Sequence, residues 1–200
     1  MRKTLYISIF LGLLTNLSFS QSVFNKSKLD SLNHKRIYQI EIGNNQVIEL
    51  TETNQSETIG TLTNKVWKTN HKGIRKKQIL NTIKIPDLMA RRLLDYFQQD
   101  GITELKDCKK VGDCINGADG TTITFRTYQS GILNQASFWQ LHSDSYYNKK
   151  ESELYHQIVK ARKVYSHIKS EFDLQKQFRD FINRLPKGTY SYGMIILTKK

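Results

Sequence analysis

The sequence lacks an apolar run of the roughly 20 residues that a helix needs to cross a bilayer. Its mainly apolar run at residues 5–14 is about half that length, and it follows Arg2 and Lys3. A basic start followed by a short apolar core is typical of a secretory signal peptide. The lack of a membrane-spanning apolar segment therefore argues against an integral membrane protein, and the short apolar run at residues 5–14 predicts export.

Small polar residues follow the apolar run. Ser18 and Ser20 suit the small-residue positions of a signal peptidase site, and cleavage after them makes Gln21 the first mature residue. We therefore predict that residues 1–20 are a signal peptide and that the protein is periplasmic or secreted. The alternative is an N-terminal helix that stays attached as an anchor.

Acidic residues are scarce. The chain has 18 Asp and Glu against 31 Lys and Arg; residues 1–20 hold two of the basic residues, so 29 remain and the mature net charge is +11. Such a field attracts polyanions, and export favours acidic polysaccharide or anionic lipid headgroups over nucleic acid. The alternative is that the charge only maintains solubility.

The densest run of positive charge lies at residues 71–77. We predict that this run is a loop that precedes a strand at 78–85. Its cationic side chains are expected to bind an anionic component of the cell envelope or a protein partner. The candidate binding residues are Lys72, Arg75, Lys76 and Lys77.

Cysteine occurs only at positions 108 and 114. Two cysteines with no histidine at ligand spacing cannot complete a tetrahedral zinc site. A redox-active pair is the other alternative, but the five intervening residues do not match its usual two-residue spacing. In an oxidising compartment we predict a disulfide between Cys108 and Cys114 that shapes a local loop.

Common catalytic motifs are also missing. The sequence has no Gly-rich phosphate loop, no Gly-x-Ser-x-Gly elbow and no paired His-Glu helix motif. His142 and Asp144 are the catalytic candidates, because an aspartate two residues after a histidine can orient it as a general base. Short polar runs of this kind also form turns. We therefore predict no cofactor and favour a non-enzymatic protein.

Side chains with oxygen ligands gather around the cysteines. Calcium takes such ligands, but their spacing does not fit an EF-hand loop, and two neighbouring lysines oppose a cation. Turn formation explains these residues, so no metal is predicted. The residues are Asp107, Asp113, Asn116 and Asp119.

Aromatic residues have two interpretations. Flat rings can line a groove for a sugar or a peptide, or they can pack in an ordinary core, which we favour. The residues concerned are Trp139, Tyr146, Tyr147, Tyr190 and Tyr192.

Alternating apolar residues predict strands, and apolar residues at helical spacing predict helices. The strands are expected at 36–42, 46–52, 58–67, 78–85, 121–128, 134–142 and 190–197, and the helices at 86–99, 149–169 and 170–185. Residues 21–35 are expected to form a loose arm before a single domain at 36–200. We predict an α+β fold, with a mainly antiparallel sheet of about six or seven strands and three helices packed largely on one face.

Two finer predictions concern the C-terminal part. Apolar residues on both faces of the strand at 190–197 predict that it lies inside the sheet and is covered by helices. The string Ser170-Glu171-Phe172-Asp173 has the pattern of a capping box, which predicts that a new helix begins at Ser170.

A cysteine loop that runs into Asp119-Gly120-Thr121-Thr122 and then a strand with Phe125 resembles small exported proteins of Gram-negative bacteria without an assigned function. The resemblance covers mainly the C-terminal half and includes the string Tyr190-Ser191-Tyr192-Gly193. It implies export and a disulfide-bridged loop, and it assigns no catalytic residue.

Three functional hypotheses remain. The first is a non-enzymatic module that binds at the cell envelope through residues 71–77 and the disulfide-shaped loop. The second is a hydrolase with dispersed catalytic residues around His142 and Asp144. The third is an inhibitor or immunity-type protein that binds one protein partner.

Overall fold

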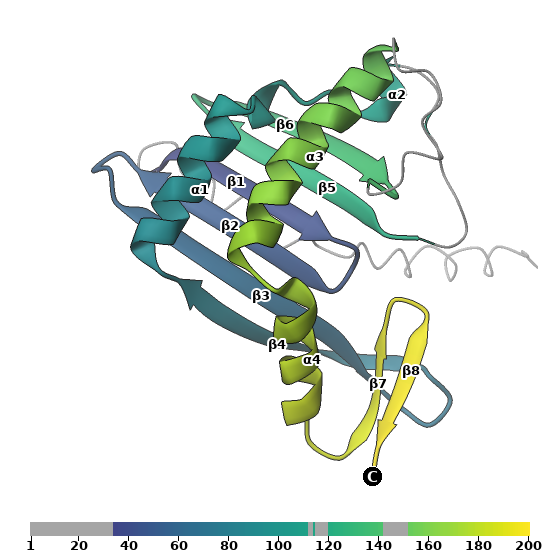
Figure 1. Cartoon of the computed structure of the whole chain (residues 1–200). Helices are drawn as coiled ribbons and strands as arrows, with labels where there is room; N and C mark the ends of the chain where they lie inside the picture. Colours follow the sequence, from purple (N-terminus) through teal and green to yellow (C-terminus); the bar gives the residue numbers. More distant parts are fainter. Residues whose placement is uncertain (1–33, 112–113, 115–119, 142–151) are drawn as a thin grey trace, which may run out of the picture. The chain divides into compact units, whose positions relative to one another are not determined.

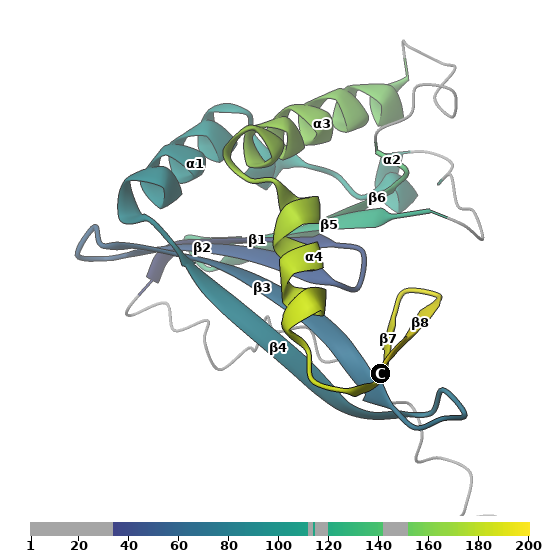
Figure 2. The same cartoon turned by 60° about the horizontal axis from the view of Figure 1, so that its bottom comes forward.

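The computed structural model describes residues 34–111, 114, 120–141 and 152–200. These residues form an eight-stranded sheet with helices on one face, as Figure 1 and Figure 2 show. The α+β fold is therefore confirmed. The strands are β1 (His34–Ile42), β2 (Gln46–Thr53), β3 (Thr58–Thr69), β4 (Arg75–Ile85), β5 (Thr122–Gln129), β6 (Ile132–Trp139), β7 (Gly188–Tyr192) and β8 (Ile195–Lys199). The helices are α1 (Asp87–Gln99), a short 3-10 helix η2 (Ile102–Glu104), α2 (Cys108–Val111), α3 (Glu153–Glu171) and α4 (Leu174–Arg184).

The strand order is β6-β5-β1-β2-β3-β7-β8, and β4 pairs with the other side of β3. All these pairings are antiparallel. Because β3 is longer than β2, the last residues of β3 extend past β2 and pair with β7, which places Trp67 opposite Ser191. The β3–β4 and β7–β8 hairpins therefore meet at one end of the sheet (Figure 1).

The main core lies between the sheet and helices α1 and α3. Alternate strand residues point to the helices, as the period of a half-buried strand requires. On α1, Leu93 and Phe97 are four residues apart and both are fully buried. Burial of each such side chain contributes about 1.5–3 kcal/mol, so this layer supplies much of the stability of the fold. The largest fully buried side chains of this layer include Tyr38, Ile40, Ile48, Leu50, Phe125 and Phe138.

Gly60 of β3 lies where α1 comes closest to the sheet. A β-carbon added to Gly60 would lie 2.8 Å from the β-carbon of Ala90 and 2.9 Å from that of Ile85. Ala90 belongs to α1 and Ile85 ends β4, so neither atom can move without its backbone. The missing side chain at Gly60 therefore sets how closely α1 packs on β3.

We expect the substitution Gly60→Ala to lower the free energy of unfolding by about 1–3 kcal/mol, because overpacking displaces backbone. Urea denaturation measures this change. Gly131→Asn is the matched control, since an added β-carbon there has nothing within 4 Å and asparagine tolerates positive φ. Equal stability of Gly60→Ala and the wild type would contradict this packing.

The prediction for the last strand is wrong. The segment at 190–197 is two strands, β7 and β8, joined by a turn at Gly193, where φ is +54°. β8 lies at the end of the strand order, and Ile195 and Ile196 are exposed. Two adjacent isoleucines therefore mark an edge strand here and not the interior of the sheet.

The predicted capping box is also wrong in its cap residue. The α3 helix continues to Glu171, and the hydroxyl of Ser170 donates a hydrogen bond to the carbonyl of His167 at 2.8 Å. Asp173 caps α4 instead, because its Oδ1 accepts a hydrogen bond from the N–H of Lys176 at 2.8 Å. The break between the two helices falls at Phe172 and Asp173, a few residues after the predicted start at Ser170.

The segment that follows α1 covers one edge of the sheet. The Nδ2 of Asn134 in β6 donates to the carbonyl oxygens of Thr103 and Leu105 at 3.1 and 2.7 Å. The N–H of Ser137 in the same strand donates to Oδ2 of Asp107 at 3.1 Å. These contacts satisfy polar groups that an open edge leaves unpaired.

The predicted disulfide is present. It joins Cys108 and Cys114, whose Cα atoms are 5.1 Å apart. Asp107, directly before it, also accepts a hydrogen bond from the N–H of Lys109 through Oδ1 at 3.1 Å. The carboxylate of Asp107 thus forms a turn, as expected, while Asp113, Asn116 and Asp119 lie outside the described residues.

Candidate binding site

The turn between β3 and β4 is held by Asn70. Its side-chain Oδ1 accepts hydrogen bonds from the N–H groups of Lys72 and Ile74 at 3.0 and 2.9 Å. Its backbone N–H donates to the carbonyl of Ile74 at 3.0 Å. Gly73 has φ +77°, which a glycine adopts without strain. The turn therefore has a defined conformation that fixes where its side chains project.

Positive charge gathers at this turn. Residues 68–77, which we call the basic hairpin end, contain five Lys and Arg residues and no acidic residue. The strand register places Lys68 opposite Lys77. Like charges that face each other on neighbouring strands are destabilising, so an anionic ligand would relieve their repulsion. The five residues, all exposed, are Lys68, Lys72, Arg75, Lys76 and Lys77.

The cations of the basic hairpin end are not paired with acidic side chains in the described structure. Within the described ranges, none of these five side chains takes part in an ion pair. Elsewhere Lys106, for example, pairs with Glu153 at 2.6 Å and Lys160 with Glu104 at 2.7 Å. The basic hairpin end thus gathers five cations that no ion pair of the described residues neutralises.

Arg75 stacks on an aromatic ring. Its guanidinium carbon lies 5.6 Å from the centroid of Trp67, a cation–π contact worth about 0.5–1 kcal/mol at an exposed site. Trp67 lies opposite Ser191 in β7, and Ser191 lies opposite Ile196 in β8. These three side chains form a row across the strands, so Trp67 and Ile196 lie on one face of the sheet, while Lys68 and its partner Lys77 point to the other face.

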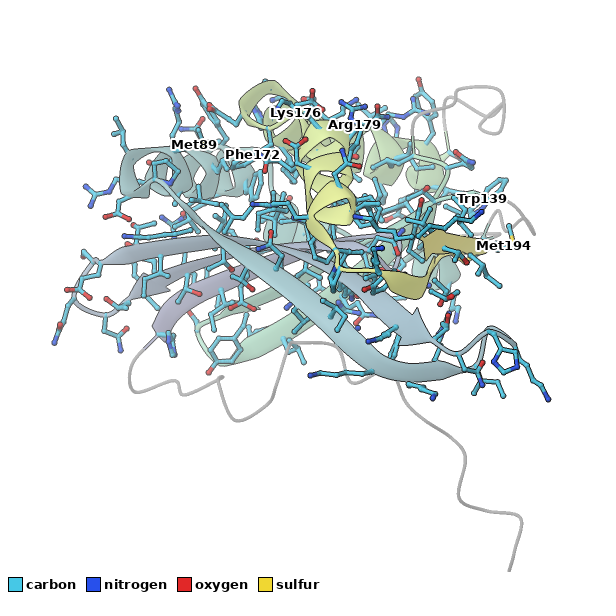
Figure 3. The ribbon with its side chains drawn as sticks, turned by 90° about the horizontal axis from the view of Figure 1, so that it is seen from below. Met89, Trp139, Phe172, Lys176, Arg179 and Met194 are labelled. Atoms are coloured by element: carbon cyan, nitrogen blue, oxygen red, sulfur yellow. A yellow bond between two sulfur atoms is a disulfide. The ribbon has the colours of Figure 1, made fainter. Side chains whose placement is uncertain are left out.

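Exposed aliphatic side chains adjoin the charges. Ile74, inside the turn, is 60% exposed, and Ile196 is 62% exposed. A β-carbon added to Gly73 would lie 3.2 Å from Cδ1 of Ile196, so the turn and β8 are close neighbours. Met194, in the turn between β7 and β8, is 79% exposed and lies at the outer end of that hairpin (Figure 3). We call Ile74, Met194 and Ile196 the aliphatic tips.

The structure brings the four predicted binding residues together at one hairpin. The predicted loop is only partly a loop, because Arg75, Lys76 and Lys77 belong to β4. Sequence reasoning missed Lys68, which joins the cluster through its pairing with Lys77. It also missed Trp67 and Ile196, which come to lie in one row only through the order β3-β7-β8.

The disulfide loop lies elsewhere. The segment at 103–107 that leads into it is bound to β6, at the edge of the sheet away from β4. Five strand-to-strand steps separate β6 from β4, which at about 4.8 Å per step is roughly 24 Å. Residues 103–107 and the basic hairpin end therefore do not form one surface.

The predicted catalytic pair, His142 and Asp144, lies outside the described residues, so the hydrolase hypothesis stays a prediction. Within the described part, His167 of α3 contacts Asp100 through Nε2 at 2.8 Å and stacks on Tyr96, with ring centroids 4.4 Å apart. The neighbouring hydroxyls of Ser166 and Ser170 donate to carbonyls of their own helix. The histidine–aspartate contact therefore serves to join α1 and α3.

A second charged cluster lies on the sheet face away from the helices. Glu41 accepts hydrogen bonds from Nζ of Lys65 at 2.6 Å and from Nη1 of Arg126 at 2.9 Å. Burial raises the pKa of Glu41, but the hydrogen bonds and charges of Lys65 and Arg126 outweigh burial, so its pKa lies below the ordinary value. This buried network is satisfied internally, which favours a structural role.

The same network continues across the neighbouring strands. Arg126 donates through Nε to Gln135 at 2.9 Å and through Nη1 to Gln39 at 3.0 Å. Gln39 in turn donates to Oε2 of Glu49 at 3.1 Å. Sequence reasoning saw only the alternation of Gln39 and Glu41, because the partners are set by the strand register.

The described surface has two grooves near α4. One, of about 640 Å³, lies at the junction of α3 and α4 and includes Lys169, Glu171 and Asp173. The other, of about 520 Å³, lies between β4 and α4 and includes Asn81 and Arg184. Both are lined by acidic and basic side chains together, the second by Asp180 and Arg184, so neither groove carries the uniform positive charge of the basic hairpin end.

A metal is not favoured at the cysteine loop. Asp107, Cys108 and Cys114 bring potential ligand atoms within 4.8 Å of one another. The two sulfur atoms are joined in the disulfide and are therefore not thiolate ligands.

Comparison with protein-family models gives no match, and comparison with curated proteins gives none either. Among the described residues, no helix has both the length and the apolar character that crossing a membrane requires.

Proposed function

We propose that this chain is an exported, non-enzymatic module that binds an anionic component of the cell envelope through the basic hairpin end. The observation that carries the proposal is the gathering of five exposed cationic side chains on one hairpin without an ion-pair partner in the described structure. Elsewhere on the described surface Lys106 and Lys160 are paired with acidic side chains, whereas these five cations are not.

The disulfide supports the export part of the proposal. Cys108 and Cys114 are joined, and disulfides persist in oxidising compartments such as the periplasm and the extracellular space. In these compartments the abundant polyanions are acidic polysaccharides and lipid headgroups. The predicted signal peptide at residues 1–20 agrees with this compartment.

The geometry favours a ligand with spread negative charge over one small anion. Lysine is a flexible point charge, whereas a specific carboxylate or phosphate site uses the planar fork of arginine. Four of the five cations are lysines, and the one arginine, Arg75, lies over Trp67. A polyanion can contact several such lysines at once, and the attraction then falls steeply with salt.

We expect the triple variant Arg75→Gln, Lys76→Gln, Lys77→Gln to lose at least about tenfold in affinity for an anionic polysaccharide, because each lost contact forfeits counterion release. The measurement is binding of the exported protein to immobilised dextran sulfate over a range of salt concentrations. The salt dependence should also become shallower in the variant.

The matched control is Arg91→Gln, Lys109→Gln, Lys110→Gln. It removes the same charge from exposed positions on α1 and α2. Because total charge falls equally, the control separates a local site from a general effect of net charge. Equal losses in the two triple variants would overturn the hairpin as the contact surface.

A further inference from the structure

We propose that the anionic ligand is the surface of a lipid bilayer, and that the aliphatic tips enter it while the basic hairpin end contacts the headgroups. This inference rests on the proposed function and names its ligand class. It follows from the two kinds of side chain that share this end of the sheet. Ile74 lies in the chain between Lys72 and Arg75, so apolar and cationic side chains leave the same turn.

The aliphatic tips come from two hairpins that touch. Ile74 belongs to the β3–β4 turn. Ile196 belongs to β8 and lies beside Gly73 of that turn. Met194 lies in the turn of the same β7–β8 hairpin, at the side of the sheet in Figure 3. All three are more than half exposed in the folded chain. Their burial in acyl chains removes apolar surface from water without any rearrangement of the fold.

The charges fit a headgroup layer. Anionic lipids at a membrane surface attract basic side chains by about fivefold in affinity for each Lys or Arg near the surface. The exposed cations Lys72, Lys76 and Lys77 flank Ile74 in the chain, so they meet the headgroups when that side chain enters the bilayer. Basic side chains next to exposed apolar ones are the combination by which amphipathic segments bind at membrane interfaces.

A polysaccharide is the less favoured ligand. Sugar rings are bound by stacking on exposed aromatic faces, and the ring of Trp67 is instead stacked by Arg75. Exposed aliphatic tips add nothing to recognition of a sulfated or carboxylated sugar, whereas they add affinity for a bilayer. The test therefore compares a bilayer with a soluble polyanion and treats polysaccharide binding as an outcome.

The experiment uses the exported protein, with its N-terminus verified by mass spectrometry, and sedimentation with vesicles. One set of vesicles is pure phosphatidylcholine and the other contains about 30% phosphatidylglycerol as the anionic lipid. Dextran sulfate is the soluble polyanion. We compare the wild type with the hairpin charge variant Arg75→Gln, Lys76→Gln, Lys77→Gln and with the apolar variant Ile74→Ser, Met194→Ser, Ile196→Ser.

We expect binding to anionic vesicles and weak binding to neutral ones. The affinity of the charge variant for anionic vesicles should fall on the order of 100-fold, because each of the three lost cations accounts for about fivefold. Its binding to dextran sulfate should weaken as well. The affinity of the apolar variant for anionic vesicles should fall at least about tenfold. Its affinity for dextran sulfate should stay within about twofold of the wild-type value. The apolar control is Leu88→Ser, Ile132→Ser, Leu133→Ser, at equally exposed positions elsewhere, and it should bind as the wild type does.

Two results separate this inference from the proposed function. If the apolar variant binds anionic vesicles as tightly as the wild type, or if the wild type binds dextran sulfate but not anionic vesicles, the bilayer is not the ligand and the proposed function stands. If the charge variant binds both probes as the wild type does, the proposed function fails as well.

Discussion

Substitution of Arg36 by methionine should lower the free energy of unfolding by about 3 kcal/mol, because it breaks a buried ion pair. In β1 the guanidinium of Arg36 donates hydrogen bonds to Glu52 of β2 and Gln98 of α1, and its Nη2 lies 3.3 Å from Oδ1 of Asp95. The side chain of Arg36 is only 8% exposed. In a domain of this size the loss corresponds to a fall of roughly 6–12 °C in Tm, measured by calorimetry.

Lys35 provides the matched control for Arg36. Its Nζ pairs with the same carboxylate of Glu52 at 3.1 Å, but the Lys35 side chain is 58% exposed. Exposed pairs contribute little, so Lys35→Met should stay within about 1 kcal/mol of the wild type. Equal shifts in Tm for the two substitutions would contradict a stabilising role for the buried contacts of Arg36.

Substitution of Glu41 by glutamine should lower the free energy of unfolding by about 3 kcal/mol at pH 7, because it leaves the buried ammonium of Lys65 without its carboxylate partner. Lys65 is 6% exposed and Glu41 is 13% exposed. The matched control is Glu104→Gln, which removes the exposed pair with Lys160. That control should leave the unfolding midpoint close to the wild type.

The effect of Glu41→Gln should depend on pH. Burial by itself raises the pKa of Glu41. The hydrogen bonds from Lys65 and Arg126 have a larger, opposite effect, so the pKa of Glu41 lies below its ordinary value of 4.5. A lowered pKa gives stability that is fully present above pH 4.5 and is lost as pH falls through the folded-state value. The difference between wild type and variant should therefore shrink below pH 4.5, as urea denaturation over a pH series can measure. A difference that stays constant or grows as pH falls would contradict this network.

Local patterns predicted most of the fold. The alternation around Tyr38 and Ile40 identifies β1, and the four-residue spacing of Leu93 and Phe97 identifies α1 and its buried face. Their pattern is periodic over several residues, so it reports which side is buried without knowledge of the partner. The grouping of strands and helices then fixes the α+β class.

The C-terminal hairpin shows where local patterns fail. Gly193 is the one turn signal between β7 and β8, and the adjacent isoleucines at 195 and 196 suggest a strand buried on both faces. In the structure β8 has no neighbour on its outer side in the strand order, so these residues stay exposed. Burial at this strand depends on which elements cover it, and the sequence pattern does not contain that information.

The candidate site was predictable only in part. A run of basic residues is visible in the sequence, and Lys72 and Arg75 to Lys77 do lie together. The contributions of Lys68 and Ile196 depend on register and strand order over long separations. For the same reason the network of Glu41, Lys65 and Arg126 was invisible, since its members are brought together only by the pairing of β1, β2, β3 and β5.

The central claim is that the basic hairpin end holds the protein at the envelope, and envelope pelleting tests it most directly. Exported wild type and the two charge variants are mixed with isolated envelope at about 0.1 M salt and at about 1 M salt, where screening differs strongly. We predict that the wild type and the Arg91, Lys109, Lys110 control pellet at low salt and are released at high salt. The Arg75, Lys76, Lys77 variant should stay in the supernatant at both salt concentrations. Pelleting of that variant at low salt to the same extent as the wild type would contradict the account.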